Sequence, residues 1–187
     1  MYKRQEIRFH ARAGQGAKSA AQLIAEAALD KGKFIQAFPN YGPERSGAPM
    51  TTYVRINDKP ITTHQPVTNP DIVAVIDSTL LDFVNVTQGM KEDSILIVNT
   101  PKDKEWVKNK TGFNGNIYTL DATRIALDNL KRDIPNLPII GAIIKLTNIV
   151  RLEDLENHIR DMFIKKLGKE MTEANIKCLK QGYEAVS

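Results

Sequence analysis

The stretch EIRFHARAGQGAKSAAQLIAEAALDKGKFIQAF, residues 6–38, contains the pattern that decides the fold. Residues 6–10 alternate apolar and polar side chains, which is typical of a β-strand. Two glycines then interrupt the alternation, and residues 17–29 are rich in Ala and Leu with the apolar period of a helix. Residues 34–38 predict a second strand. This strand–turn–helix–strand order favours a parallel pair of strands joined by a right-handed crossover.

The rest of the chain continues to alternate between strand and helix patterns. Residues 39–50 are dense in Gly and Pro and predict a loop, after which residues 51–56 and 61–63 predict a hairpin. Further strands are expected at 71–77, 94–100 and 116–121, and helices at 79–88, 103–109, 122–131, 139–149, 152–166 and 171–185. We therefore expect an α/β fold: one three-layer α/β/α domain over residues 1–187, with a mixed, mostly parallel sheet and a helical C-terminal end.

The composition is that of an ordinary soluble globular protein, with 42% hydrophobic residues, 26% charged residues and a net charge of +4. The single cysteine, Cys178, has no partner within this chain for a disulfide, a CxxC pair or a four-cysteine iron–sulfur cluster. The first residues lack the apolar core of a signal peptide, and the longest aliphatic run, at 139–144, is much shorter than a membrane span. We expect a cytoplasmic protein that does not enter a membrane.

The turn after the first predicted strand has features of a phosphate-binding loop. Gly14 and Gly16 permit close approach of the backbone to a ligand, and the following helix N-terminus attracts anions. Lys18 and Ser19 add a charge and a hydroxyl. The known phosphate motifs nevertheless fail, because Ala17 stands where a P-loop needs glycine, and Ser19 where a dinucleotide fingerprint needs Gly or Ala. Two interpretations stay open: an anion site, or a tight turn with a purely structural purpose.

A second loop, YGPERSGAPM at residues 41–50, follows the second predicted strand. In a mostly parallel sheet the loops after the strand ends gather on one side, so we expect this loop to lie beside the glycine turn. Arg45, with Ser46 next to it, has the fork of donors that binds a phosphate oxygen. Glu44 can pair with a cation of a partner chain. The alternative is that these charges are solvated and that the loop only shapes an interface.

No catalytic or metal-binding set is recognisable in the sequence. His10, His64 and His158 are far apart and form no metal-ligand pattern, and we expect His10 to be a hydrogen-bonded structural histidine. Asp77 and Asp121 follow apolar strands, and we interpret them as helix caps. Basic residues are scattered without interleaved aromatics, which argues against nucleic-acid binding. Binding features without a catalytic set suit one subunit of a larger enzyme.

Several segments together resemble a known family. They are HARAGQGAKSAAQLIAEAAL (10–29), YGPERSGAPM (41–50), NPDIVAVIDSTLL (69–81), PNLPIIGA (135–142) and EANIKCLKQGYEAV (173–186). Through them the chain resembles, over nearly its whole length, the gamma subunits and gamma domains of 2-oxoacid:ferredoxin oxidoreductases, especially those of the pyruvate enzymes. Each segment alone is weak evidence, whereas their joint presence is specific.

The resemblance implies a reaction in which pyruvate and coenzyme A become acetyl-CoA and carbon dioxide while two electrons pass to ferredoxin. It also implies thiamine diphosphate and iron–sulfur clusters, which companion alpha, beta and delta subunits hold. The thiamine signature, GDG followed by Asn, and the cluster cysteines are absent from this chain. We therefore expect this chain to bind no cofactor alone, to contain no catalytic residue and no metal, and to be inactive by itself. Because other members of this family use 2-oxoglutarate or branched-chain oxoacids, the resemblance leaves open which oxoacid is the substrate.

Coenzyme A is the phosphorylated reactant that this division of labour leaves for the chain to bind. Our hypothesis places one of its phosphates against both loops, on Gly14, Gly16, Lys18, Ser19, Arg45 and Ser46. The alternative is that both loops only dock neighbouring subunits, through the interface residues Tyr41, Glu44, Arg45 and Pro49. A stand-alone coenzyme A- or nucleotide-binding module and a scaffold subunit without a ligand are the other functions that the sequence leaves open.

Overall fold

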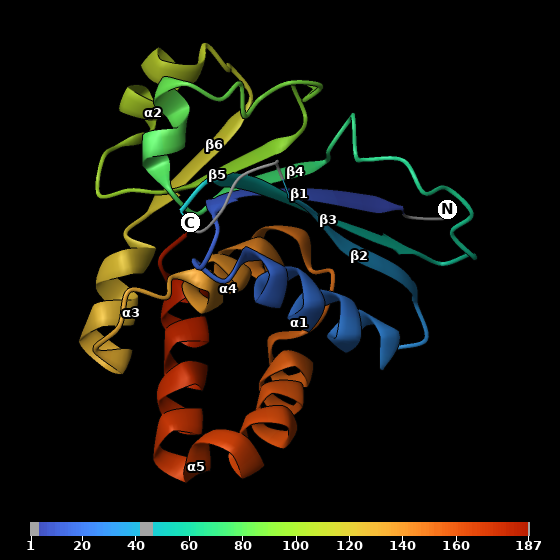
Figure 1. The fold of residues 1–187 in the computed structure, drawn as a ribbon, viewed down its shortest axis with the longest axis vertical. Coiled ribbons are helices and arrows are strands. Elements are labelled where there is room, and N and C mark those ends of the chain that lie inside the picture. The colour runs from blue at the N-terminus through green and yellow to red at the C-terminus, as the bar shows by residue number, and fades with distance from the viewer. Residues whose placement is uncertain (1–3, 42–46, 187) are drawn as a thin grey trace.

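A computed structural model describes residues 4–41 and 47–186 of the chain. Its strands are β1 (Gln5–Arg12), β2 (Phe34–Tyr41), β3 (Pro49–Asn57), β4 (Ile72–Val75), β5 (Ile95–Asn99) and β6 (Asn116–Leu120). Its helices are α1 (Ala17–Leu29), the short 3-10 helix η1 (Ser78–Asp82), α2 (Lys104–Thr111), α3 (Ala122–Leu130), α4 (Asn136–Thr147) and α5 (Leu152–Glu184). Figure 1 shows the arrangement of these elements, coloured in chain order.

Within the described residues, six strands form one sheet in the order β2-β3-β1-β4-β5-β6. β3 runs antiparallel to both of its neighbours, β1 and β2, whereas the remaining pairs are parallel. The prediction of a mixed, mostly parallel sheet is therefore confirmed. β3 and β2 lie on one side of β1, and the later strands β4, β5 and β6 lie on its other side. Such a reversal point, here between β1 and β4, is where α/β sheets commonly bind ligands.

The position of β3 contradicts two local predictions. β1 and β2 do not pair with each other, because β3 lies between them with Thr52 opposite Phe9 and Tyr53 opposite Phe38. The predicted hairpin between 51–56 and 61–63 is also wrong, since residues 61–63 are not part of a strand. A strand of residues 61–63 could form only a short ladder of hydrogen bonds with β3. β1 and β2 instead pair with it along their whole length and bury its apolar side chains.

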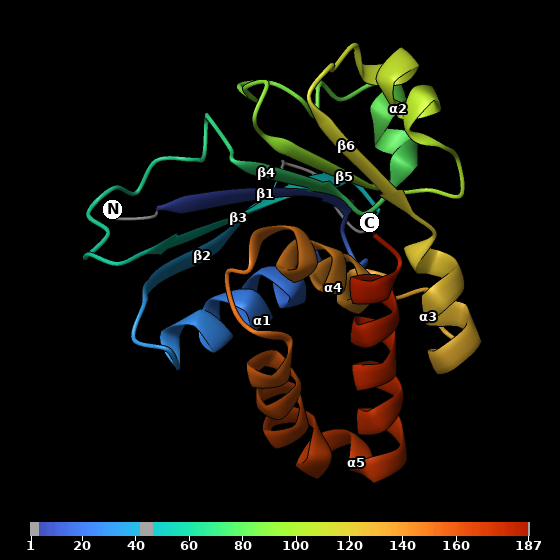
Figure 2. The ribbon, with the colours of Figure 1, turned by 180° about the vertical axis from the view of Figure 1, so that it is seen from behind.

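Helices cover both faces of the sheet, as the three-layer prediction requires. Ile7 and Phe9 of β1 belong to a core that includes residues of α1, α4 and α5. Val73 and Val75 of β4 point to the opposite face, where they pack in a cluster with Val107 of α2. Figures 1 and 2 show α1, α3, α4 and α5 on one side of the sheet and α2 on the other.

The C-terminal part is helical, as predicted. α4 begins at Asn136, three residues before the expected start, and α5 consists of two arms that fold back on each other. The break lies at Gly168, whose φ of 76° and ψ of 170° are not helical. α4 and α5 cross closely at Gly141, where there is no room for a side chain. A Cβ at this position would come within 2.1 Å of the Leu179 carbonyl oxygen.

Two predicted elements near the sheet edge differ from the structure. The helix expected at 79–88 is only η1 followed by an irregular segment. A buried guanidinium needs acceptors, and this irregular segment supplies two of them to Arg8, the carbonyls of Val86 and Gln88. The loop expected at 39–50 is shorter, because the β2–β3 ladder extends until Tyr41 lies opposite Met50.

Candidate functional site

The glycine turn connects the end of β1 to the start of α1 at the reversal point of the sheet. Gly14 and Gly16 both have positive φ, 102° and 83°. The turn is closed locally, because the backbone N–H of Gln15 donates to the Arg12 carbonyl and the Gln15 side-chain oxygen accepts from the Arg12 N–H. A Cβ at Gly16 would lie 2.9 Å from Nδ2 of Asn136, so this glycine also lets the turn pack against α4.

The first turn of α1 presents unused donors. No described side chain caps the helix, and the first hydrogen bond within it runs from the Ala20 N–H to the Gly16 carbonyl, 2.9 Å away. Lys18 and Ser19 are both exposed on this turn. The free N–H groups, the helix dipole and the Lys18 charge together form an arrangement that can bind an anion. The predicted role of these residues in binding a coenzyme A phosphate stays a prediction.

The second loop meets the glycine turn, as the sequence predicted. The Ala13 N–H donates to the Ala48 carbonyl at 3.0 Å, and the Gly47 N–H donates to the Ala13 carbonyl at 3.3 Å. Nη1 of Arg12 donates to the Gly47 carbonyl at 3.1 Å. These bonds hold the start of β3 and the end of β1 side by side at the same sheet edge.

The residues that the sequence assigned to this loop are only partly described. Glu44, Arg45 and Ser46 lie outside the described residues, so their predicted roles stay predictions. Tyr41 ends β2 opposite Met50, and Pro49 is exposed at the start of β3. The expected position of the loop beside the glycine turn is thus confirmed at its end at residues 47–48.

Asp77, at the end of β4, is the most strongly bonded carboxylate at this edge. It accepts hydrogen bonds from the N–H and the hydroxyl of Thr79, at 3.0 and 2.6 Å, and from Nε2 of Gln15 at 2.8 Å. Nε of Arg12 lies 3.2 Å from its Oδ2. Burial acts to raise the pKa of Asp77, but these hydrogen bonds and the Arg12 charge outweigh it, so the pKa lies below the ordinary value. The carboxylate therefore ties η1 to the glycine turn, and its predicted capping role is confirmed.

A cavity of about 350 Å³ opens beside the glycine turn, at the carboxyl ends of β4, β5 and β6. Its polar lining comes from Gln15, Asp77, Ser78, Asn99, Thr100, Asp121, Thr123 and Asp133. Nδ2 of Asn99 donates to the Ile76 carbonyl at 2.8 Å and to the Thr123 hydroxyl at 2.9 Å, which fixes the cavity wall. Asp121 caps α3 by accepting from the Arg124 N–H at 2.9 Å, as predicted.

The chemistry of this cavity differs from that of the glycine turn. Its carboxylate, amide and hydroxyl groups are mainly hydrogen-bond acceptors, which suit hydroxyl or amino groups of a ligand and repel a phosphate. The sequence analysis missed Gln15, Asn99 and Thr123 as lining residues. The available signal was the polar residue that ends each apolar strand, because the ends of parallel strands meet at one edge.

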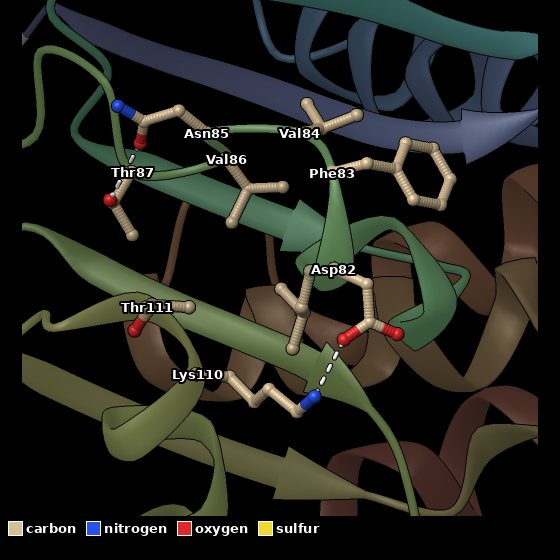
Figure 3. Close-up of a pocket in the computed structure, with 9 residues that line it drawn as sticks. Asp82, Phe83, Val84, Asn85, Val86, Thr87, Lys110 and Thr111 are labelled. Carbon is tan, nitrogen blue, oxygen red and sulfur yellow. Dashed lines mark hydrogen bonds and ion pairs between the residues drawn. The ribbon is translucent and has the colours of Figure 1, made fainter.

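A second cavity, of about 320 Å³, lies between the segment 81–87 and the end of α2 (Figure 3). Nζ of Lys110 pairs with Oδ1 of Asp82 at 2.6 Å, and the ring of Phe83 extends away from this pair. Phe83 is 60% exposed, and the Arg12 guanidinium lies 5.4 Å from its ring centroid. Arg12 therefore connects this segment to the glycine turn.

His10 and Cys178 are two buried titratable groups among the described residues, and burial shifts the pKa of each. His10 is 7% exposed, and its Nε2 has no hydrogen-bond partner among the described residues, so the expectation of a hydrogen-bonded histidine is wrong for this atom. Burial, with the nearby Arg8 charge, lowers the pKa of His10 to about 3. Burial likewise raises the pKa of the Cys178 thiol to about 11, which keeps it protonated and unreactive.

Residues 4–41 and 47–186 provide neither a metal-ligand group nor a membrane-spanning helix. No group of three or more His, Cys, Asp or Glu side chains in this part of the chain is placed to hold a metal ion. None of its helices combines the length and the apolar character that a bilayer crossing requires. With one cysteine in the whole sequence, a four-cysteine cluster does not fit this chain.

The chain is thus an α/β domain. One edge of its sheet carries a turn that can bind an anion and a cavity lined mainly by hydrogen-bond acceptors. The sequence pattern of the family described as pyruvate ferredoxin/flavodoxin oxidoreductase matches residues 6–185. The chain belongs to this family.

Individual proteins are similar to the chain over nearly all of its length. Pyruvate synthase subunit PorC of Thermotoga maritima is 55% identical over 181 residues, 97% of this chain and 94% of that protein. The pyruvate/ketoisovalerate oxidoreductases common subunit gamma of Thermococcus litoralis is 47% identical over 180 residues, 96% of this chain and 95% of that protein. The crystal structure of pyruvate oxidoreductase subunit PORC from Thermotoga maritima has a TM-score of 0.90 and 52% identity, covering 99% of this chain and 98% of that chain.

Proposed function

We propose that this chain is the gamma subunit of a multisubunit pyruvate synthase. The complex converts pyruvate, coenzyme A and oxidised ferredoxin to acetyl-CoA, carbon dioxide and reduced ferredoxin. The observation that carries the proposal is the 55% identity to pyruvate synthase subunit PorC, which spans almost the full length of both proteins.

Companion alpha, beta and delta subunits supply the thiamine diphosphate and the iron–sulfur clusters, and ferredoxin meets the complex rather than this chain alone. The single buried cysteine supports this division, because one thiol cannot ligate a four-cysteine cluster. The chain contributes docking surfaces at the carboxyl edge of its sheet, where the glycine turn and the loop of residues 41–49 meet. We place the complex in the cytoplasm.

We further infer that the glycine turn and the second loop bind a phosphate of coenzyme A. The uncapped start of α1, with exposed Lys18 and Ser19, supports an anion at this point. The neighbouring cavity supplies acceptors for the hydroxyl and amino groups that coenzyme A also carries. Arg45 completes the phosphate contact in this proposal.

The subunit proposal is tested by affinity purification from the native host under anaerobic conditions. We expect thiamine- and cluster-bearing subunits to co-purify, and the assembly to reduce ferredoxin with pyruvate only when coenzyme A is present. If the chain elutes alone at its own mass, the proposal is overturned.

A second candidate function is a gamma subunit that two oxoacid enzymes share. The name of the Thermococcus litoralis relative, a common subunit gamma of pyruvate and ketoisovalerate oxidoreductases, favours this candidate. Comparison of pyruvate, 2-ketoisovalerate and 2-oxoglutarate as substrates of the purified assemblies decides between one enzyme and several. Two distinct sets of companion subunits would identify a shared subunit.

Coenzyme A binding is tested by calorimetry on assembled complexes. We expect Lys18→Ala and Arg45→Ala each to weaken coenzyme A binding about tenfold or more, since each removes a charge-assisted contact. Lys108→Ala, which removes an exposed charge on α2, is the matched control and leaves the affinity unchanged. Wild-type affinity in both test variants would leave only the docking role for the two loops.

A further inference from the structure

The elbow of α5, defined as residues 164–171, projects from the body of the molecule. The two arms of the helix meet there at Gly168, and Figures 1 and 2 show the elbow at the end farthest from the sheet. All eight residues of this segment are exposed. They include the large apolar side chains Ile164, Leu167 and Met171, which are 37%, 47% and 37% exposed. An exposed apolar cluster of this kind marks an interaction surface more often than an isolated exposed leucine does.

The elbow is held in place by contacts between the two arms. Nε of Arg160 lies 3.1 Å from the Glu173 carboxylate, and Nζ of Lys180 lies 3.0 Å from that of Glu156. At the start of the second arm, the hydroxyl of the buried Thr172 donates to the Gly168 carbonyl at 2.7 Å. These contacts order the two arms of α5 that carry the exposed apolar side chains, so less conformational entropy is lost when a partner binds.

The charge of the elbow indicates the chemistry of its partner. Lys165, Lys166 and Lys169 share the segment with the exposed apolar side chains, and Glu170 is its one acidic residue. Within the described part of the chain, Lys165 and Lys166 form no ion pair. A second copy would bring the same excess of positive charge, which repels. An acidic surface complements it and steers association.

We propose that the elbow of α5 docks into a companion subunit of the oxidoreductase, in an apolar socket bordered by Asp and Glu side chains. The identity of the partner rests on the proposed function, whereas the chemistry of the socket follows from the elbow itself. Leu167 is the central apolar contact, because it is the most exposed of the three apolar side chains. The lysines form the polar rim of the interface.

Reconstitution of the complex from separately prepared chains tests the proposal. We expect Leu167→Asp to weaken binding of this chain to the companion subunits at least tenfold. The charge reversal Lys165→Glu/Lys166→Glu has a similar effect, which is larger at low ionic strength because salt screens the rim charges. The matched control is Leu127→Asp, an equally exposed leucine on α3, 42% exposed, which keeps wild-type affinity. Circular dichroism and thermal melting verify that all variants fold.

Each result that differs from these expectations contradicts a specific part of the proposal. If wild-type chain binds the companion subunits and the Leu167 and lysine variants bind equally well, the elbow is not the docking surface. If only the lysine variant binds normally, the socket is not acidic. If wild-type chain does not bind the companions, the proposed function fails as well. Sedimentation with phosphatidylserine vesicles, or concentration-dependent dimerisation, in the absence of an effect on assembly would assign the elbow to a membrane surface or to a second copy instead.

Discussion

Gly16 and Asn136 are in contact across the junction of two helices: a Cβ at Gly16 would lie 2.9 Å from Nδ2 of Asn136. The glycine precedes the first residue of α1, and the asparagine is the first residue of α4. The glycine turn is thereby fixed to the C-terminal helices as well as to the sheet. The glycine pattern that resembles a phosphate loop consequently has a packing role whether or not it also binds a ligand.

Replacement of this glycine should destabilise the protein in two ways. Gly16→Ala places an L residue at φ 83° and drives its Cβ against Asn136. We expect a loss of roughly 2–3 kcal/mol in the free energy of unfolding. Urea denaturation of the purified chain measures the loss.

The matched control is Gly14→Ala, because Gly14 also has positive φ but its Cβ would meet nothing within 4 Å. Asn136→Ala removes the contact and should recover about 0.5–1 kcal/mol in the Gly16→Ala background. The same change should recover nothing in the Gly14→Ala background. Equal behaviour in both backgrounds would show that only backbone strain matters.

His10 should make the stability of the protein depend on pH in the mildly acidic range. Its pKa is lowered by burial to about 3 in the folded chain, whereas an unfolded histidine titrates near 6.5. Between these values the unfolded state binds one more proton, so stability falls as the pH decreases. The slope approaches about 1.4 kcal/mol per pH unit, and the loss from pH 6.5 to pH 5 is roughly 1.5 kcal/mol.

His10→Gln removes the titrating group and should remove this part of the pH dependence, even where it lowers stability at every pH. His64→Gln is the control, because His64 is exposed. Denaturant unfolding of the three proteins at pH 7, 6 and 5 gives the slopes. Identical slopes for wild type and His10→Gln would contradict a neutral buried His10.

The glycine turn and the second loop illustrate what the sequence can predict here. Both follow from local rules: glycines break an alternating strand, and loops after strand ends gather at one edge. The capping roles of Asp77 and Asp121 were predicted for the same local reason. These features depend on neighbouring residues in the chain, which a single sequence displays directly.

The parts that the sequence did not predict depend on contacts between distant residues. β3 pairs with both β1 and β2, and Val54 and Ile56 of β3 are buried in this position. The local sequence pattern does not show with which strands β3 will pair. The irregular segment that replaces the predicted helix at 79–88 supplies an acceptor to Arg8, which lies 78 residues from Val86. The acceptor-rich cavity likewise requires Asn99 and Thr123, 24 residues apart, to meet.

Arg55 should be a major contributor to the stability of the sheet. Its side chain is buried, and its guanidinium pairs with Glu6 at 2.7 Å while donating to Oε1 of Gln36 and to the Gln65 carbonyl. Arg55→Met removes a buried donor that these three partly exposed acceptors share, although Arg4 still pairs with Glu6, and we expect a loss of about 2–3 kcal/mol. The irregular segment 58–70 should also exchange its amide hydrogens faster, because the bond to Gln65 holds it.

Arg124→Met is the control for Arg55, since it breaks an exposed pair with Asp128 and should change the stability by at most about 0.5 kcal/mol. The double change Glu6→Leu/Arg55→Met removes both partners and should cost less than Arg55→Met alone. An equal or larger loss in the double variant would show that the loss of the Arg55 partner of Glu6 is not the main cost.

Asp154 should lose its contribution to stability at a lower pH than the pH at which the His10 effect begins. Its carboxylate accepts two hydrogen bonds from Arg151, at 2.8 and 2.7 Å, and pairs with Lys31 at 2.9 Å, so it joins the start of α5 to the end of α1. The hydrogen bonds from Arg151, then that from Lys31, hold the pKa of this carboxyl well below its usual range. The unfolded group titrates near 3.9, so its stabilisation is fully present above that pH and is lost as the pH falls toward the folded pKa.

Asp154→Asn should therefore lower the free energy of unfolding at pH 7 and at pH 5 by the same amount, and the difference from wild type should shrink only below about pH 4. The His10 effect begins near pH 6.5 and continues down to about pH 3, so the interval from pH 7 to pH 5 shows the His10 effect without the Asp154 effect. Asp161→Asn is the control, because Asp161 is exposed on the same helix. A difference between wild type and Asp154→Asn that already shrinks between pH 7 and pH 5 would mean that the Arg151 and Lys31 contacts do not hold this carboxylate in its charged form.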